Sequence, residues 1–325
     1  MPTTSPRPSP LTVPRLGLGS APIGKMYTPI SEPQARATIQ AALAAGLTFI
    51  DTAPYYGTGL SEKRVGAAIH GHPRDQIVLE TKVGRLVTME DLPPTRWDEG
   101  IVFDYSRDGV RRSLDDSLTR LNVDYVDILL VHDPDLNPES YQAAVDEAFP
   151  ALADLRRQGV IKAIGAGMNQ WEMLEQFARH ADPDCFLLAG RYTLLEQTSL
   201  SFLSMCQSRG IQIWLGGVFN SGILARGAGP DAKYNYQSAS PVIQAKVQRL
   251  AAVCERHGVA LKTAALHFAA AHPAVKSLIL GMETPDEVAD NLAAWHTPVP
   301  LALWAELQAE GLLVEGSPVP TQEQP

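Results

Sequence analysis

Short apolar runs alternate with helical patterns along this chain from Leu16 almost to its end, and this alternation limits the possible fold more than any other feature. Each run is short and apolar throughout, which is typical of strands buried on both faces of a parallel sheet. Eight strands are predicted, at residues 16–19, 47–51, 77–82, 126–132, 161–165, 186–189, 211–215 and 277–281.

Helices are predicted between these strands and after the last of them. Their ranges are 34–45, 62–70, 107–121, 141–157, 171–180, 199–209, 241–257, 261–271, 286–294 and 301–313, and Ser61 is expected to cap the second. Eight strand–helix units favour an α/β fold closed into a single-domain (β/α)8 TIM barrel, with an open doubly wound sheet as the alternative. The barrel is assigned to residues 11–313, preceded by a Pro- and Ser-rich disordered lead-in at 1–10 and followed by a loose tail at 314–325.

Composition excludes several classes of protein. The chain has 325 residues, 45% of them hydrophobic, and a formal net charge of -9 with no basic run, which argues against a nucleic-acid surface. No apolar run approaches the ~20 residues of a membrane span, and the N-terminus lacks the apolar core of a signal peptide. Cys185, Cys206 and Cys254 are far apart, so we expect buried reduced thiols and no zinc or other metal. These features indicate a cytoplasmic monomer or small homo-oligomer that acts on small molecules, with no nucleic-acid or membrane partner.

Reactive side chains stand at the ends of three consecutive predicted strands. Asp51 ends the second strand, Lys82 the third and His132 the fourth, and Tyr56 follows Asp51 by five positions. In a barrel these ends are neighbours on one rim, where active sites are built. A lysine ammonium favours the phenolate of a nearby tyrosine and lowers its pKa, a carboxylate holds the lysine, and a neutral histidine can orient an oxygen. The set suits proton transfer at an oxygen while a hydride moves at the attached carbon; a simple rim ion pair is the structural alternative.

Four stretches carry a family resemblance: DTAPYYGTGLSEKRVG, LETKVGR, SLTRLNVDYVDILLVHDPD, and IKAIGAGMN followed by a helix that begins with tryptophan. Together they resemble the aldo-keto reductases, from about Leu16 to Asn291. The resemblance implies a (β/α)8 barrel with a nicotinamide cofactor across its carboxyl face. It also implies an Asp–Tyr–Lys–His tetrad, which falls on Asp51, Tyr56, Lys82 and His132.

The resemblance also implies a set of cofactor-binding residues. LGLGSAPIG is not a Rossmann fingerprint, because Pro22 stands at the third glycine position. Gly19 and Ser20 are instead expected near the nicotinamide, and Asn169 on its carboxamide, although Met168, Ala189 and Gly216 replace the residues usual there. The pyrophosphate strap corresponds to the glycine-rich loop after the seventh strand, with Gly217, Val218, Asn220, Ser221, Gly222 and Leu224.

Cofactor choice is expected to depend on charge near the last strand. The resemblance puts Gly281 and Glu287 where the NADP-binding members of the family carry a lysine and an arginine, and Glu283 and Asp290 add negative charge. Carboxylates repel a 2′-phosphate but accept hydrogen bonds from a free ribose hydroxyl. Asn291 keeps an adenine contact common to both cofactors. We therefore expect NAD, with NADP possible if Lys276 or Arg226 reaches the phosphate.

Further motifs indicate the reaction: FDYSRDGVRRSLDDSLTRL, GAGMNQWE, AGRYTLLEQ and FNSGILA. They resemble the branch that oxidises L-fucose and other D-threo-aldoses, together with pyridoxal 4-dehydrogenase. The resemblance implies oxidation of an aldose at C1 of its cyclic hemiacetal to the lactone. Candidate readers of the substrate hydroxyls are Tyr27, Trp97, Tyr105 and Asp133. Three alternatives remain: pyridoxal oxidation, an NADPH-dependent aldehyde reductase, and a non-catalytic nucleotide-binding barrel.

Overall fold

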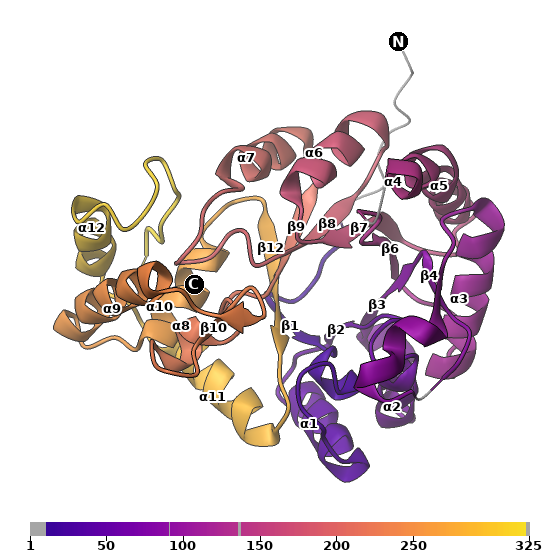
Figure 1. Ribbon diagram of the computed structural model, residues 1–325, viewed down its shortest axis with the longest axis horizontal. Coiled ribbons are helices and arrows are strands. Elements are labelled where there is room, and N and C mark those ends of the chain that lie inside the picture. Colours follow the sequence, from indigo (N-terminus) through magenta and orange to yellow (C-terminus); the bar gives the residue numbers. More distant parts are fainter. Residues whose placement is uncertain (1–10, 91, 136–137, 323–325) are drawn as a thin grey trace.

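A closed barrel of eight parallel strands forms the centre of the computed structural model, which describes residues 11–90, 92–135 and 138–322 (Figure 1). The strands follow one another around the ring in sequence order, and the first pairs with the last. They are β1 (Leu16–Gly19), β2 (Phe49–Asp51), β3 (Val78–Val83), β6 (Ile128–His132), β7 (Ala163–Met168), β8 (Cys185–Ala189), β9 (Gln212–Gly216) and β12 (Val275–Gly281). The (β/α)8 prediction is confirmed, and the open sheet is excluded by the pairing of β1 with β12.

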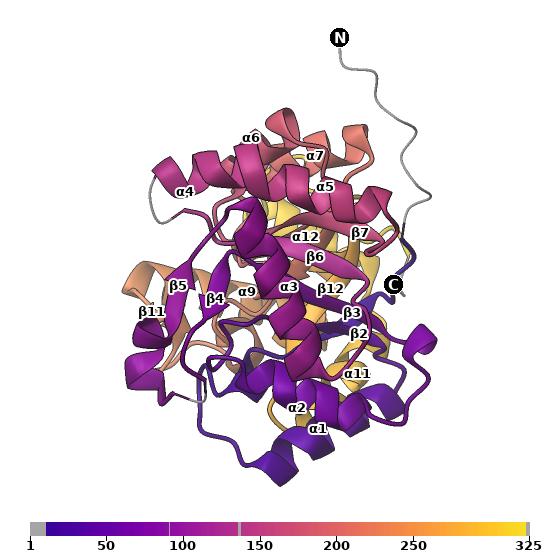
Figure 2. The same ribbon diagram turned by 90° about the vertical axis from the view of Figure 1, so that its right-hand side faces the viewer.

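Helices form the outer layer around this ring (Figures 1 and 2). They are α1 (Glu32–Ala44), α2 (Leu60–Ile69), α3 (Arg107–Leu121), α4 (Pro138–Ala143), α5 (Phe149–Arg157), α6 (Trp171–His180), α7 (Leu200–Arg209), α8 (Ile223–Arg226), α9 (Pro241–Arg256), α10 (Leu261–Ala270), α11 (Pro285–His296) and α12 (Leu301–Ala309). The single helix predicted at 141–157 is divided into α4 and α5 by a π-helical turn, Ala144–Ala148.

Hydroxyl side chains begin four of the helices. Ser31, Ser106, Ser240 and Thr284 each accept a hydrogen bond from the backbone N–H three residues later, which stabilises a helix start by about 1 kcal/mol. The expected cap at Ser61 is wrong, because α2 begins earlier, after Gly59 in a left-handed conformation. Ser61 is fully buried, and its hydroxyl donates instead to Ser20.

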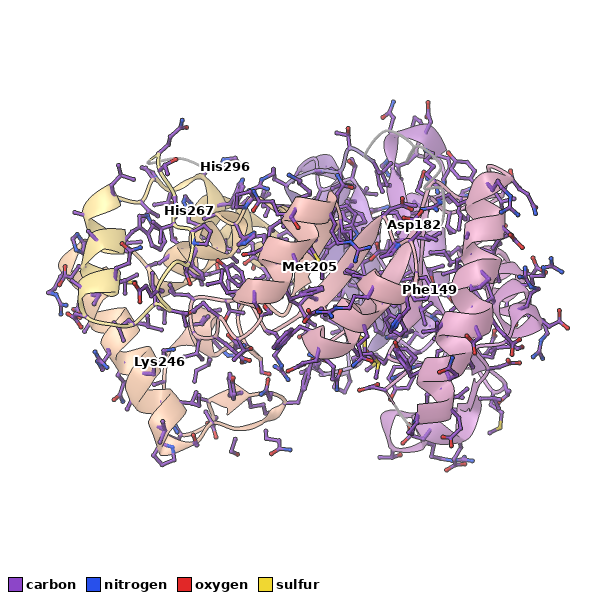
Figure 3. All side chains as sticks on the ribbon, turned by 90° about the horizontal axis from the view of Figure 1, so that it is seen from above. Phe149, Asp182, Met205, Lys246, His267 and His296 are labelled. Atoms are coloured by element: carbon purple, nitrogen blue, oxygen red, sulfur yellow. The ribbon has the colours of Figure 1, made fainter. Side chains whose placement is uncertain are left out.

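Two apolar layers hold the barrel together. Inside the ring, Phe49, Ile128, Leu130, Leu187 and Trp214 are buried together, and Leu11 and Val13 pack against them. A larger cluster fills the space between the strands and the helices. Figure 3 shows how widely the helical layer extends, with Phe149 of α5 on one side of the molecule and Lys246 and His267 of α9 and α10 on the other.

Two small hairpins lie in the long connections that follow β3 and β9. β4 (Arg85–Val87) pairs with β5 (Ile101–Phe103), with the 3-10 helix η3 (Pro94–Gly100) between them. β10 (Lys233–Tyr234) pairs with β11 (Gln237–Ser238) in the connection after β9. Both hairpins therefore follow the carboxyl ends of barrel strands.

The chain termini depart in part from expectation. The lead-in at 1–10 lies outside the described residues. The tail expected to be loose packs against the barrel: Val314 donates its N–H to Gln197 Oε1 at 3.2 Å, Ser317 is buried, and Val319 contacts the core. All three cysteines are free and buried, as expected. No helix among the described residues is long and apolar enough to cross a membrane, and the same residues contain no metal-binding group of three His, Cys, Asp or Glu side chains.

Candidate active site

Asp51, Lys82 and Tyr56 form one hydrogen-bonded group at the carboxyl ends of β2 and β3. The Lys82 ammonium donates to Asp51 Oδ1, to Thr52 O at 2.9 Å and to Tyr56 Oη at 3.1 Å. Lys82 is 1% exposed, so its charge is compensated almost entirely by these partners. The structure thus brings three of the four predicted tetrad residues into direct contact.

The backbone next to Tyr56 is fixed by a very close contact between two loops. Gly57 has a φ of +67°, and a Cβ added there would lie 2.3 Å from Gly24 O. A Cβ added to Gly24, at the end of the 3-10 helix η1 (Pro22–Gly24), would lie 2.7 Å from Tyr56 O. Only glycine fits at either position, so the two glycines determine where the phenol stands.

The backbone of Asp51 is held by a buried hydroxyl network. Ser20 donates to Asp51 O through both its N–H, at 2.9 Å, and its Oγ, at 2.7 Å. Ser61 Oγ lies 2.7 Å from Ser20 Oγ and 3.0 Å from Thr52 Oγ1. Ser20 was predicted to lie near the nicotinamide, but its side chain is fully buried and already occupied by protein partners.

His132 lies beside Tyr56 at the end of β6. The two rings meet edge to face, with centroids 5.9 Å apart and planes at 90°. Burial, followed by the charges of Arg85 and Lys82, holds the pKa of His132 well below its usual value, so the imidazole is neutral at neutral pH. Its Nδ1 has no hydrogen-bond partner among the described residues, and Nε2 lies 3.4 Å from Asp133 Oδ2. The hydroxyl of Tyr105 fixes the strand end by donating to His132 O at 2.8 Å.

The pKa of Tyr56 departs from the sequence-based expectation. Burial, with the charge of Asp51 as the next cause, raises it well above the usual value of tyrosine, although part of the side chain stays accessible. The nearby ammonium of Lys82 was expected to lower this pKa. In the folded protein desolvation and the carboxylates of Asp51 and Asp133 outweigh that contribution, so the net direction of the pKa is upward.

An ion pair that the sequence did not predict stands at the mouth of the site. Arg85 of β4 bonds Asp133 Oδ2 at 2.9 Å, and its guanidinium lies 4.7 Å from the centre of the Tyr55 ring. Burial raises the pKa of Asp133 to about 6 despite the opposing charge of Arg85. The pair offers a donor and an acceptor next to His132. Trp97 belongs to η3, and its side chain lies outside the described part of the structure.

Behind the reactive group, a buried acid joins α2 to two neighbours. Glu62 is fully buried, accepts from Thr81 Oγ1 at 2.6 Å and pairs with Arg120 of α3 at 2.6 Å. Thr81 precedes Lys82 on β3, so this ion pair anchors the strand that carries the lysine. Glu62 belongs to the stretch that carries the family resemblance, but nothing in the sequence indicated these partners.

Gly19 ends β1 and pairs in register with Asp51, whereas two further positions considered for the nicotinamide lie at the ends of β7 and β9. Asn169 follows β7 and donates to Ala189 O at 2.9 Å. Gly216 ends β9 and is buried, and a Cβ added there would lie at ordinary contact distances from Leu187, at 3.4 Å, and Ala189, at 3.7 Å.

The predicted strap follows β9 as a tight left-handed turn. Asn220, Ser221 and Gly222 have φ values of +46°, +59° and +92°. The Asn220 amide bonds Thr193 and Gly190, and the Ser221 hydroxyl accepts from Tyr236 N–H at 3.0 Å, so both side chains support the loop. The remaining strap residues are Gly217, which is exposed, and Val218 and Leu224, whose apolar side chains are buried. Their proposed contacts with a phosphate therefore have to come from the backbone.

The far end of the predicted cofactor site lies at β12 and α11. Asn291 is buried, and its Oδ1 has no hydrogen-bond partner among the described residues, which fits an amide waiting for a ligand donor. Glu287 accepts the N–H of Glu283 at 2.6 Å. Lys262, which the sequence did not single out, pairs with Asp290.

Three other residues considered for the choice of cofactor, Gly281, Lys276 and Arg226, have defined positions in the structure. Gly281 ends β12 against Pro22, whose Cγ would lie 3.1 Å from an added Cβ. Lys276 lies near the amino end of β12, away from Glu287, and donates to Pro273 O. Arg226 donates to Ser221 O at 3.2 Å, beside the strap.

An aromatic pair bridges two loops over this face. Tyr27, after η1, stacks on Tyr236 of the β10–β11 hairpin, with centroids 6.2 Å apart and planes at 10°. Tyr27 is 56% exposed and Tyr236 60% exposed.

Known proteins match nearly the whole chain. A model of the aldo/keto reductase family matches residues 15–309. A pyridoxal 4-dehydrogenase from Microbacterium luteolum is 39% identical over 93% of this chain and 95% of its own. A D-threo-aldose 1-dehydrogenase from Pseudomonas sp. is 37% identical over 94% of this chain and 95% of its own. The solved structure of an aldo-keto reductase from Bacillus halodurans, in its holo form, superposes with a TM-score of 0.72 at 25% identity and covers 96% of both chains.

Proposed function

Because the chain belongs to the aldo/keto reductase family, we propose that it oxidises an aldose at C1 of the cyclic hemiacetal to the lactone and uses NAD as the oxidant. Members of this family are oxidoreductases that use a nicotinamide cofactor and act on small molecules. The observation that carries the proposal is the Tyr56 hydroxyl, 3.1 Å from the Lys82 ammonium and beside the neutral His132. This arrangement supports proton transfer at a substrate oxygen.

In the proposed reaction, deprotonated Tyr56 takes the proton of the C1 hydroxyl. Lys82 stabilises the phenolate, and Asp51 keeps the ammonium in place. His132, being neutral, can donate one N–H to the same oxygen and so fixes its position. When bound, an oxidised nicotinamide supplies the acceptor for the hydride and a positive charge that favours the phenolate. Asn169 and Asn291 would hold the two ends of that cofactor, with the backbone around Gly217 and Gly222 along its phosphates.

The substrate class is supported by the polar mouth and by the relatives. Arg85 offers donors and Asp133 offers an acceptor beside His132, which suits a ring that carries several hydroxyls. The relatives are named for a D-threo-aldose and for pyridoxal. Both compounds pair an aldehyde with a hydroxyl that can close a cyclic hemiacetal. Oxidation of such a hemiacetal carbon is therefore the common chemistry.

Pyridoxal is the second candidate substrate, and one observation favours it. The relative named for pyridoxal is 39% identical to this chain, slightly more than the 37% of the aldose relative.

A steady-state screen tests the function. L-fucose, D-arabinose, galactose and pyridoxal are each to be oxidised with NAD and with NADP, and simple aldehydes reduced with NADH and NADPH. The proposal expects the highest kcat/KM for one of the aldoses with NAD. If reduction of a simple aldehyde with NADPH exceeds every oxidation in kcat/KM, the aldose assignment is wrong.

The pH dependence should identify the direction of the reaction. Because the pKa of Tyr56 is raised, its phenolate is scarce at neutral pH and increases about tenfold per pH unit below that pKa. Oxidation needs the phenolate, so kcat for oxidation is expected to rise from neutrality toward about pH 10. Below about pH 6, protonation of Asp133 weakens its pair with Arg85 and adds an acid limb to kcat/KM. Asp133→Asn should remove the acid limb and keep the alkaline rise; oxidation that falls with rising pH would contradict the base role of Tyr56.

Cofactor preference is expected to favour NAD over NADP by at least about tenfold in kcat/KM, which requires only about 1.4 kcal/mol of discrimination. The carboxylate of Glu287 would repel a 2′-phosphate, and Lys262, the nearby cation, is already paired with Asp290. Glu287→Gln removes the charge but keeps the oxygen that accepts the Glu283 N–H, so it should raise kcat/KM with NADP and leave helix stability unchanged. Asp286→Asn, on the same exposed turn, is the matched control. Equal use of both cofactors by the unmodified protein would show that the acidic loop does not discriminate.

A further inference from the structure

Glu80 is a buried acid directly below the proton-transfer group, and the reaction described above does not use it. It lies on β3 two residues before Lys82, and its Cα pairs in register with that of Asp51 on β2. Side chains at paired positions and at alternate positions of a strand point to the same face, so Glu80 shares the barrel interior with Asp51 and Lys82. It is 0% exposed, and neither carboxyl oxygen has a hydrogen-bond partner among the described residues.

Lys82 cannot neutralise this acid through a hydrogen bond. An ammonium has three protons to donate, and Lys82 directs them to Asp51 Oδ1, Thr52 O and Tyr56 Oη. An ionised carboxylate without a donor is strongly disfavoured in an apolar interior. In agreement, burial and then the charge of Asp51 raise the pKa of Glu80 well above its usual value, so the carboxyl is neutral.

Two nearby polar groups match the needs of a neutral carboxyl. Lys82 occupies Oδ1 of Asp51, while no hydrogen bond to its other oxygen, Oδ2, is found in the described part of the chain. The indole N–H of Trp214 is fully buried and also lacks a partner there. Both Asp51 and Trp214 are close enough to influence Glu80. The remaining titratable neighbours are Lys82, Tyr56 and the Cys185 thiol, whose pKa is raised first by burial and next by Glu80.

We propose that Glu80 is a positioning residue: its protonated carboxyl accepts from Trp214 Nε1 and donates to the free oxygen of Asp51. The Glu80 proton then fixes the second oxygen of Asp51, as Lys82 fixes the first. The negative charge of Asp51 is shared between two donors, so less of it acts on the Tyr56 phenolate. An ionised Glu80 would do the opposite, because its charge raises the pKa of Tyr56. The inference rests on the proposed roles of Asp51, Lys82 and Tyr56, but not on the identity of the sugar.

Infrared spectroscopy of the holoenzyme near pH 8 tests the protonation state directly. The unmodified protein should show the carbonyl band of a buried protonated carboxyl, and Glu80→Gln should lack it. Trp214→Phe should keep the band but shift its frequency, because one donor to the carbonyl is lost. This readout does not depend on turnover, so it stays informative if the proposed substrate proves wrong. Absence of the band in the unmodified protein overturns the proposal.

Kinetics on any substrate that the enzyme turns over test the positioning role. Glu80→Gln should keep kcat and the basic limb of its pH profile nearly unchanged, since the amide N–H can donate to Asp51 and its oxygen can accept from Trp214. Glu80→Leu should lower kcat about tenfold and move the basic limb upward, because Asp51 loses a donor. Ile128→Val, at the position paired with Glu80 on β6, trims the same interior without removing a polar group and should leave the limb in place.

Two kinetic results would contradict the proposal. A basic limb that moves downward in Glu80→Gln would mean that the unmodified Glu80 is ionised. An unshifted limb in Glu80→Leu would mean that Glu80 only fills space. If Glu80→Leu does not fold, Glu80→Gln and the infrared comparison with Trp214→Phe still decide between these outcomes.

Discussion

Replacing Tyr56 with phenylalanine is expected to lower kcat by about 10²–10⁴-fold, the usual contribution of a positioned acid or base. The change removes the single hydroxyl that Lys82 holds at 3.1 Å and keeps the ring that packs against His132. The cofactor dissociation constant should stay nearly unchanged, because the predicted cofactor contacts come from other residues. Single-turnover and steady-state rates, together with a direct cofactor titration, measure both quantities.

Tyr192→Phe is the matched control for this experiment. Tyr192 is 1% exposed and packs on Phe268, and its hydroxyl has no hydrogen-bond partner among the described residues. Losing that hydroxyl should change neither kcat nor stability appreciably. Full activity in Tyr56→Phe would remove Tyr56 from the mechanism, and equal losses in both variants would point to a general effect of the substitution.

Replacing Lys82 with methionine is expected to reduce kcat at least about 10²-fold and to move the basic limb of the pH profile upward. The phenolate loses its nearest cation, so the pKa of Tyr56 should rise further. Stability should fall as well, because one-sided removal of a buried ion pair leaves the Asp51 carboxylate without its partner, a loss of roughly 3–5 kcal/mol. Urea unfolding and the pH profile of kcat measure the two effects separately.

A double variant separates catalysis from stability. Asp51→Asn combined with Lys82→Met contains no unpaired charge, so much of the stability lost in Lys82→Met should return while activity stays low. Lys276→Met is the control, since this exposed lysine lies near the opposite end of the barrel. If the double variant recovers activity along with stability, Lys82 acts through folding alone.

The sequence was sufficient to predict the barrel and the contacts within the tetrad. Both depend on regular geometry: alternating units close a ring, and the ends of consecutive parallel strands are neighbours on one rim. Asp51, Lys82 and His132 each end a strand at the predicted residue or one residue before the end. The order of the strands alone was therefore enough to predict that these side chains lie close together.

The features that the sequence did not reveal depend on contacts between distant segments. Arg85 meets Asp133 across 48 positions, and Lys262 meets Asp290 across 28. The raised pKa of Tyr56 depends first on how deeply the side chain is buried, and the degree of burial cannot be read from the sequence. Serine is a common N-cap residue, but α2 begins before Ser61, directly after Gly59, whose φ is +91°. Glu80 could have been noticed, since alternation along β3 places it on the same face as Lys82.

The proposed roles in proton transfer and in dinucleotide binding fall on different strands of the barrel. The side chains assigned to proton transfer come from β2, β3, β6 and the loop after β2, whereas most of those assigned to the dinucleotide come from β7, the loop after β9, β12 and α11. Substitutions at well-separated sites usually act additively. On the proposed assignment, substitutions on α11 that change the preferred dinucleotide should leave proton transfer at Tyr56 unchanged.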